Sequence, residues 1–308
     1  MASYKEFHKR SVEDRNGFWG EQAQLIHWNK APEQVYDFSK PPFVKWFVGG
    51  ETNLCYNAVD RHAESNPNGK ALVYISTETD EEKIYSFSEL RTEVMRMAAI
   101  YQELGVKKGD RVLIYMPMIA EACFAMLACT RIGAIHSVVF GGFASHSLAT
   151  RIDDAKPTVI VSSDAGMRGG RPVPYKHLLD EAIGLAEHKP AAVLMVNRGL
   201  DKDMNVVAGR DVDYATLRAK HMDAQVPVTW LESSEPSYIL YTSGTTGKPK
   251  GVQRDTGGYA VALAASMKHI YCGNAGETFF STSDIGWVVG HSYIIYGPLI
   301  NGMATIMY

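Results

Sequence analysis

The residues best suited to chemistry lie in one short stretch, residues 241–251, with the sequence YTSGTTGKPKG. The stretch continues an apolar run at 236–242 that has the length and composition of a buried strand. Glycines let backbone N–H groups turn towards an anion, and hydroxyl and ammonium groups add further donors. Open α/β sheets bind ligands at the carboxyl ends of their strands. The stretch therefore predicts a phosphate-binding loop in preference to an ordinary flexible surface loop.

The spacing within this loop differs from that of P-loop NTPases. Their Walker A loop requires G-x-x-x-x-G-K-[ST], with the lysine opening a helix. Here Lys248 is followed by Pro249, and position 242, five residues before Gly247, holds threonine instead of glycine. The sequence therefore excludes a P-loop NTPase.

Two further segments carry residue types that suit a ligand site. Arg168 and Arg171 flank a Gly-Gly pair after the apolar run 157–163, and such arginines suit a phosphate-rich ligand, although solvated surface arginines have the same pattern. Residues 284–293, DIGWVVGHSY, line a pocket or form a core helix, and we expect His291 to be a hydrogen-bonded core or pocket histidine. The four cysteines include no CxxC pair and no Cys/His cluster of zinc spacing, so we expect free thiols and no metal centre held by the chain.

The elements that must position these residues alternate regularly. Apolar runs at 111–116, 135–140, 157–163 and 191–197 predict strands, separated by helical patterns at 119–132, 145–154 and 174–186. A second run predicts strands at 236–242, 278–284 and 304–308 with helices at 256–271 and 285–296. Continuous apolar strands alternating with helices indicate an α/β fold with two mostly parallel sheets built from βαβ units.

The remaining segments suggest how the chain is divided. Residues 71–76 and 83–85 predict a pair of strands, and Ser86 and Glu89 form a capping-box pattern at the start of a helix. The first sixty or so residues are rich in aromatic residues and proline but poorly periodic, which indicates an arm that wraps the main body, followed by a short helix around 53–66. Residues 197–234 are charged and weakly periodic, and we expect a peripheral connection. The resulting division is an arm at 1–65 and a main domain at 66–308.

Composition and charge limit the classes of partner and the cellular compartment that we expect for this protein. The 31 basic and 34 acidic residues of the 308-residue chain give a net charge of −3, which offers no argument for binding nucleic acid or an anionic membrane. The uncharged stretches 132–150 and 285–308 contain His, Ser, Gly and, in the second, Pro, so neither is expected to span a membrane. The charged N-terminus has no apolar core typical of a signal peptide, so we expect a cytoplasmic protein.

The loop at 241–251 resembles the phosphate loop of the adenylate-forming superfamily, which includes acyl-CoA synthetases, luciferases and the adenylation domains of peptide synthetases. The likeness extends to QRDTGGY at 253–259, DIGWVVGHSY at 284–293, YMPM at 115–118 and FGGF at 140–143, which are similar to short-chain acyl-CoA synthetases. The resemblance is nearest to the propionyl-CoA synthetases. It covers residues 18–308 and corresponds to the N-terminal part of such enzymes.

This resemblance implies a fold, a reaction and a set of site residues. The fold is the large N-terminal domain of adenylate-forming enzymes, preceded by the aromatic arm. A carboxylate attacks the α-phosphate of ATP to give an acyl-adenylate and pyrophosphate, and the thiol of CoA then displaces AMP. The loop residues bind the ATP phosphates, Thr242 and Lys248 act in catalysis, and Mg²⁺ accompanies ATP as its counter-ion.

The positions implied by the resemblance fall into three groups. The phosphate-binding group is Thr242, Ser243, Gly244, Thr245, Thr246, Gly247 and Lys248. The acyl-pocket group is Trp287, Val288, Val289 and Gly290. The CoA-binding group is Arg168, Gly169, Gly170 and Arg171, together with Phe140, Gly141 and Gly142.

The substrate and the extent of the enzyme remain as hypotheses. Val289 stands where acetate-activating relatives usually have threonine, so propionate is favoured, although one methylene changes discrimination by only about 1–3 kcal/mol. The alternatives are an acetyl-CoA synthetase, a domain that loads a carrier protein, and a non-catalytic module that binds nucleotide or CoA. The family's adenine and ribose motifs, its hinge and the lysine of its small C-terminal domain come after the position of Tyr308. We therefore expect an N-terminal fragment of low activity.

Overall fold

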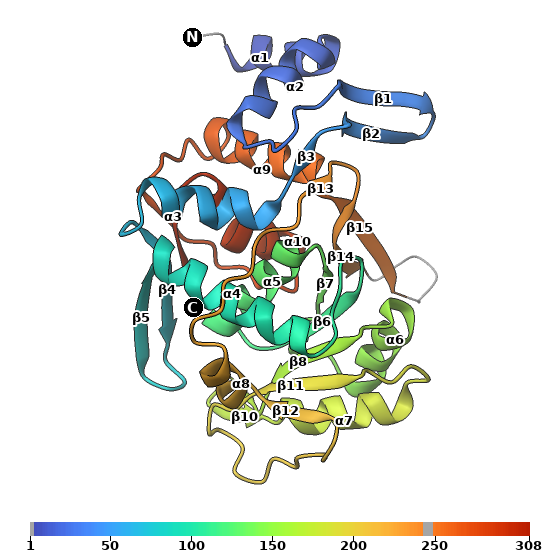
Figure 1. The fold of residues 1–308 in the computed structure, drawn as a ribbon, viewed down its shortest axis with the longest axis vertical. Helices are drawn as coiled ribbons and strands as arrows, with labels where there is room; N and C mark the ends of the chain where they lie inside the picture. The colour runs from blue at the N-terminus through green and yellow to red at the C-terminus, as the bar shows by residue number, and fades with distance from the viewer. Residues whose placement is uncertain (1–2, 243–248) are drawn as a thin grey trace.

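The computed structural model describes residues 3–242 and 249–308. At its centre is a seven-stranded sheet with the strand order β12-β11-β8-β6-β7-β14-β15 (Figure 1). All neighbouring strands in it are parallel except β14 and β15, which form an antiparallel pair at one edge. The strands are β6 (Arg111–Tyr115), β7 (Ile135–Val138), β8 (Val159–Ser163), β11 (Ala192–Val196), β12 (Asp211–Asp213), β14 (Pro236–Thr242) and β15 (Lys250–Asp255).

Helices cover this sheet on both faces, which explains why its inner strands β6, β7, β8 and β11 are almost entirely buried. Val112 and Ile114 of β6 belong to one hydrophobic core, and Leu113 and Tyr115 of the same strand belong to another. The first core contains α4 (Phe87–Glu103) and α5 (Ala120–Ile132), and the second contains α6 (Ser145–Ala155) and α7 (Tyr175–Leu185). The predicted βαβ organisation is confirmed, including the capping box of Ser86 and Glu89 at the start of α4.

A smaller sheet has the order β16-β17-β4-β5 and lies beside α4 (Figure 1). Its strands are β4 (Lys70–Ser76), β5 (Glu81–Ser86), β16 (Thr278–Phe279) and β17 (Ala304–Met307), and only β4 and β5 are antiparallel to each other. The expected strand at 278–284 is shorter than predicted, because residues 280–284 leave the sheet after Phe279. The helical region between β16 and β17 comprises α10 (Val288–Gly290), η3 (His291–Tyr296) and α11 (Gly297–Ile300), and α9 (Gly257–His269) precedes β16.

The N-terminal segment is more regular than its sequence suggested. It contains α1 (Tyr4–Glu13), α2 (Arg15–Gln22), the short helix η1 (Ala23–Leu25) and a hairpin of β1 (Gln34–Lys40) and β2 (Phe43–Val48). These elements gather at one end of the molecule, against α9, instead of wrapping around it (Figure 1). Phe18 and Phe47 are buried anchors, as the aromatic composition predicted. The expected short helix follows as η2 (Tyr56–Asp60) and α3 (Arg61–Ser65).

Two predictions about connecting segments were wrong in part. The segment 197–234 supplies the edge strand β12, the helix α8 (Tyr214–Lys220) and the short strand β13 (Leu231–Glu232), which pairs with β3 (Glu51–Thr52). The region after residue 249 forms β15, for which we predicted no strand. Both edge strands β12 and β15 are polar and lack a buried apolar run, which is the feature that identified the inner strands.

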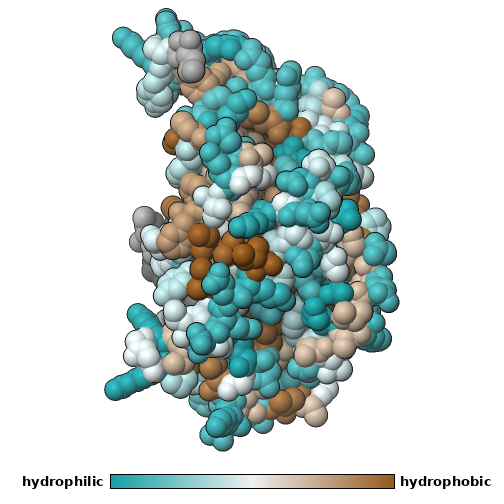
Figure 2. Space-filling model, turned by 90° about the vertical axis from the view of Figure 1, so that its left-hand side faces the viewer, coloured by the Kyte–Doolittle hydropathy of each residue, from teal (hydrophilic) through white to brown (hydrophobic). Residues whose placement is uncertain are grey.

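The face shown in Figure 2 is mostly hydrophilic, and its most prominent apolar area lies at mid-height. Exposed large apolar side chains of the molecule include Ile270, Phe280 and Trp287. Among the helices of the described residues, none is both long and apolar enough to cross a membrane.

Candidate functional site

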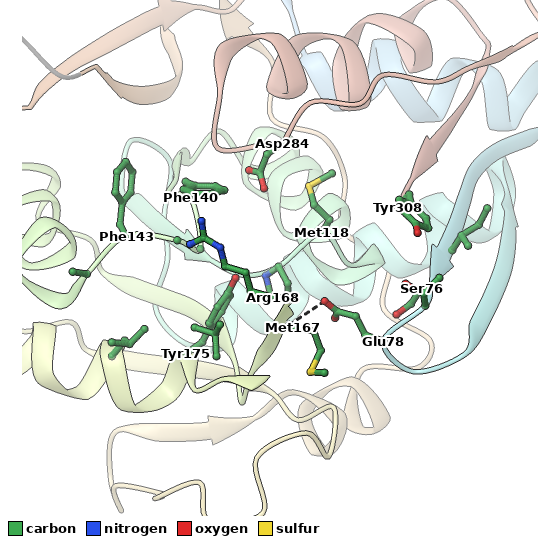
Figure 3. Close-up of a pocket in the computed structure, with 18 residues that line it drawn as sticks. Ser76, Glu78, Met118, Phe140, Phe143, Met167, Arg168, Tyr175, Asp284 and Tyr308 are labelled. Atoms are coloured by element: carbon green, nitrogen blue, oxygen red, sulfur yellow. Dashed lines mark hydrogen bonds between the residues drawn. The ribbon is translucent and has the colours of Figure 1, made fainter. Parts of the chain in front are cut away.

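The carboxyl ends of three neighbouring parallel strands open into one cavity of about 490 Å³ (Figure 3). Pro117 and Met118 follow β6, residues 140–144 follow β7, and Met167 and Arg168 follow β8. The lining also includes the end of β4 with the turn that follows it, Tyr175 of α7, Asp284 and Tyr308. The cavity therefore lies where open α/β sheets bind their ligands.

Four of the predicted CoA-binding residues line this cavity, and three do not. Phe140, Gly141, Gly142 and Arg168 contribute to its wall. Gly169 and Gly170 form the turn between β9 (Gly166–Arg168) and β10 (Arg171–Val173), with φ of +57° and +74°. Arg171 pairs with Arg168 across this hairpin but is exposed outside the cavity. The hairpin thus points one of the two arginines at the cavity.

Gly141 is required where it stands because Tyr175 packs directly against it. A Cβ at this position would lie 1.9 Å from the Tyr175 hydroxyl oxygen. The Tyr175 ring stacks on Tyr115 at 4.9 Å between centroids, and the Tyr115 hydroxyl donates to the carbonyl oxygens of Gly141 at 3.3 Å and Phe143 at 3.2 Å. Burial, with a smaller contribution from Asp284, raises the pKa of Tyr175 to about 12, so this phenol is neutral. The two tyrosines fix the turn at 140–143.

A second cavity, of about 400 Å³, lies beside β14, β15 and α9. Val288 and Val289 of the predicted acyl-pocket group line it and are about half exposed. Trp287 does not line it, and its ring lies 5.7 Å from that of Phe140, on the side of the first cavity. Gly290 is buried, and a Cβ there would lie 2.1 Å from the carbonyl oxygen of Asp284. The segment 284–290 therefore contributes residues to the lining of both cavities.

Two buried histidines hold this segment on the central sheet. The Nε2 atoms of His136, on β7, and His291 lie 3.1 Å apart, and their rings are stacked at 5.0 Å. Burial lowers the pKa of His291 to about 3 and that of His136 well below its ordinary value, so both are neutral near pH 7. His291 Nδ1 lies 3.3 Å from the carbonyl oxygen of Ile285. If Nδ1–H donates to this oxygen, His291 Nε2 accepts from His136, which is the hydrogen-bonded role predicted for His291.

The predicted phosphate loop falls mostly outside the described residues. Ser243, Gly244, Thr245, Thr246, Gly247 and Lys248 lie there, including the predicted catalytic lysine. Thr242 is the last residue of β14, is exposed, and pairs with Lys250 on β15. Before it, the Tyr241 hydroxyl donates to Asp154 Oδ2 at 2.6 Å. Among the residues that the structure describes, no group of three His, Cys, Asp or Glu side chains could hold a metal ion.

Some lining residues were not identified from the sequence. Arg254 and Asp255 of β15 and Trp46 of the N-terminal hairpin line the second cavity, and Asp284 and Tyr175 line the first. Trp46 is separated from Val288 by more than two hundred residues, so only the folded chain brings them to one cavity. The sequence around Asp284 did indicate a pocket, because this residue begins the DIGWVVG segment. An aspartate at that position, however, could equally have been a turn residue or a site residue.

The central sheet is mostly parallel, is covered by helices on both faces and has a cavity at the carboxyl ends of its strands. These features define the class of α/β proteins that bind a ligand at the carboxyl ends of their strands. The chain belongs to the AMP-binding enzyme family, which matches residues 59–308, and the acetyl-coenzyme A synthetase N-terminus matches residues 4–58. The resemblance to short-chain acyl-CoA synthetases is thereby confirmed.

Individual relatives agree with this family. The chain is 63% identical over 306 residues to a propionate–CoA ligase of Salmonella typhimurium, covering 99% of this chain and 49% of that protein. It is 48% identical over 309 residues to acyl-CoA synthetase short-chain family member 3, mitochondrial, of Rattus norvegicus, covering 100% of this chain and 45% of the relative. The solved acetoacetyl-CoA synthetase from Streptomyces lividans superposes with a TM-score of 0.90 at 27% identity, covering 100% of this chain and 46% of that chain. The chain thus spans about half the length of these relatives, and its predicted fold is confirmed.

Proposed function

We propose that the natural protein carrying these residues ligates a short-chain carboxylate, with propionate favoured, to CoA. The carboxylate attacks the α-phosphate of ATP, giving an acyl-adenylate and pyrophosphate. The CoA thiol then displaces AMP to give the thioester. A free carboxylate is a poor acylating agent, and attachment to AMP provides a good leaving group.

The observation that carries this proposal is that segment 284–290 contributes to the lining of two cavities. One cavity is lined by residues predicted to bind CoA, and the other by Val288 and Val289, predicted to contact the acyl group. A thioester-forming enzyme must bring a thiol and an acyl group together, and this segment borders both spaces. The name of the 63% identical relative, a propionate–CoA ligase, supports the same substrate class.

Further parts of the proposal extend to the roles of individual residues. Thr242 to Lys248 hold the ATP phosphates, with Thr242 and Lys248 acting on the charge that develops during adenylation, and Mg²⁺ enters with ATP. Trp287 and Gly290 support the acyl pocket. In the CoA site, Gly169 and Gly170 allow the turn that orients the two arginines. The functional division is an N-terminal arm at 1–65 and an AMP-binding domain at 66–308, in a cytoplasmic enzyme acting on small molecules without a nucleic-acid partner.

Product analysis tests the reaction class. Incubation of the natural protein with ATP, Mg²⁺, CoA and propionate is expected to yield propionyl-CoA, AMP and pyrophosphate in equal amounts. ADP in place of AMP, or binding of ATP and CoA without any product, would contradict the proposal, and the second result would favour a binding module. Parallel reactions with acetate and butyrate show which acid is converted fastest. A clear preference for acetate would indicate an acetyl-CoA synthetase instead.

The arginine pair tests the CoA assignment separately. Arg168 lines the cavity and Arg171 lies outside it. Loss of a charge-assisted contact is worth about 1.5–3 kcal/mol, or roughly a ten- to hundredfold change in affinity. We therefore expect Arg168→Ala to raise the KM for CoA by at least tenfold and Arg171→Ala to raise it less. Equal effects would show that the hairpin turns differently when CoA binds.

A further inference from the structure

We propose that Asp284 is the base that accepts the thiol proton when CoA attacks the acyl-adenylate. The proposal rests on the ligase function above and names a residue role within it. Nothing in the sequence resemblance assigned a function to this aspartate.

The carboxylate of Asp284 faces the cavity at the carboxyl edge of the sheet (Figure 3). It shares this space with Phe140 and Arg168, two of the residues predicted to bind CoA. Its own backbone leads within four residues to Val288, which lines the second cavity. A thiol that enters through the first cavity and an acyl group held in the second must meet along this segment. Asp284 is the titratable residue of segment 284–290.

One oxygen of the carboxylate is used for the local turn, and the other remains for a ligand. Oδ1 accepts a hydrogen bond from the Gly286 N–H at 2.7 Å. The Asp284 carbonyl oxygen accepts from the Trp287 N–H at 3.0 Å, so the backbone is fixed by the same turn. Within residues 3–242 and 249–308, no protein hydrogen bond reaches Oδ2. A positioned carboxylate with one free oxygen can take up a proton without disturbing the turn.

The surroundings favour uptake of a proton by this group. Burial raises the pKa of Asp284 above its ordinary value, although the hydrogen bond from Gly286 acts in the opposite direction. A base whose pKa approaches the working pH transfers protons more efficiently from a thiol of pKa about 8.5.

The other titratable groups that line this cavity come from four different elements. They are Glu78 of the β4–β5 turn, Arg168 of β9, Tyr175 of α7 and Tyr308. Glu78 is engaged by Arg198 at 2.6 Å, and the pKa of Tyr175 is raised to about 12. No salt bridge joins Asp284 to a cation among the described residues. Its carboxylate is therefore the available proton acceptor on the cavity wall nearest the acyl segment.

The step balances as follows. The thiol S–H bond breaks, and its proton goes to the Asp284 carboxylate while sulfur forms a bond to the acyl carbonyl carbon. The bond between that carbon and the phosphate oxygen of AMP breaks, and AMP leaves with the electron pair. The protonated Asp284 then releases its proton to solvent. No oxidant, reductant or further reactant is required.

The test separates the two half-reactions in the natural protein. Asp284→Asn keeps an oxygen for the Gly286 hydrogen bond but cannot accept the proton. We expect ATP–pyrophosphate exchange with propionate to stay within about threefold of the unmodified protein. We expect the rate of thioester formation from isolated propionyl-adenylate and CoA to fall by about 10²-fold or more. Asp37→Asn is the matched control, because Asp37 Oδ1 accepts from the Ser39 N–H at 2.8 Å in the same i, i+2 geometry, and Asp37 lines neither cavity.

Several outcomes would overturn the proposal. Equal slowing of both half-reactions would mean that Asp284 only shapes the segment, and an unchanged thioester rate would mean that no proton passes to it. If Asp284→Asn does not fold, Asp284→Glu replaces it in the test, because glutamate keeps a carboxylate. The acid limb of the pH profile for thioester formation must then shift. The acid limb of the pH profile for ATP–pyrophosphate exchange must stay unchanged. Absence of exchange in the unmodified protein would contradict the proposed function itself and is distinguishable from each of these results.

Discussion

Replacement of Gly141 by alanine tests whether the first cavity is the CoA site. The new Cβ would lie 1.9 Å from the hydroxyl oxygen and 2.5 Å from Cζ of Tyr175, closer than van der Waals contact allows. Gly141 is not among the glycines with positive φ, so the effect is steric. Tyr175 is held by its stacking on Tyr115 at 4.9 Å, and the open space beside it is the cavity.

The expected magnitude follows from overpacking. Inserting a methyl group into a well-packed site costs about 1–3 kcal/mol if the ring stays in place. If the ring swings away, it enters the cavity and competes with the ligand for the same space. A loss of 1.4 kcal/mol in binding is tenfold in affinity. We therefore expect Gly141→Ala to lower the free energy of unfolding of the 308-residue chain by about 1–3 kcal/mol and to raise the KM for CoA in the natural protein by at least tenfold.

Urea unfolding and CoA kinetics measure these two quantities. Gly184→Ala is the control on the same helix as Tyr175, because a Cβ there meets no atom within 4 Å, and alanine is favoured over glycine in helices. Tyr175→Ala removes the obstructing ring, so adding Gly141→Ala to it should have little further effect on stability. Unchanged stability and an unchanged KM in Gly141→Ala would refute the steric reasoning. Destabilisation without any effect on CoA would refute the assignment of the cavity.

Two further predictions concern buried ionisable groups. Asp60 and Arg131 form a buried ion pair that joins η2 to α5, with 2.8 Å between Oδ2 and Nη1 and side-chain exposures of 7% and 3%. Asp60→Ala should lower the free energy of unfolding, measured in urea, by about 3–5 kcal/mol, because it leaves the arginine unpaired. A cost below about 1 kcal/mol, as expected for Lys9→Ala in an exposed pair, would show that Arg131 finds water or another partner. The lowered pKa values of His136 and His291 mean that the unfolded chain binds more protons below pH 6.5, so stability must fall as the pH drops. His291 alone should lower the free energy of unfolding by about 2 kcal/mol between pH 7 and pH 5. The free energy of unfolding of His291→Asn should therefore fall less steeply over this pH range. An equally steep fall in the variant would contradict the neutral, buried pair.

The sequence predicted the elements whose pattern is set by burial alone. The inner strands β6, β7, β8 and β11 are covered on both faces and almost entirely buried, and Arg111 is their only charged residue, so each can be recognised locally. The edge strand β15 has five exposed residues out of six, and its pairing with β14 depends on a partner that local patterning does not reveal. The N-terminal helices α1 and α2 were not predicted because they bury few residues and so lack a periodic apolar pattern. Only their N-caps, Ser3 and Asp14, could have indicated them.

The candidate site was predictable in part for the same reason. Phe140, Gly141 and Arg168 follow strands that the pattern identified, and strand ends of a parallel sheet meet at one edge. The direction of individual side chains was not predictable. Trp287 lies on the side of the first cavity while Val288 and Val289 line the second, and Arg171 does not line the cavity that Arg168 lines. These differences arise from the turn that begins at Asp284 and from the β9–β10 hairpin, which are tertiary features.

ATP–pyrophosphate exchange is the most direct test of the central claim that these residues belong to a ligase acting through an acyl-adenylate. It should be measured on the natural protein with acetate, propionate and butyrate in parallel. We expect exchange by the natural protein that depends on the acid and is strongest with propionate. No exchange by the natural protein with any of the three acids would contradict this claim.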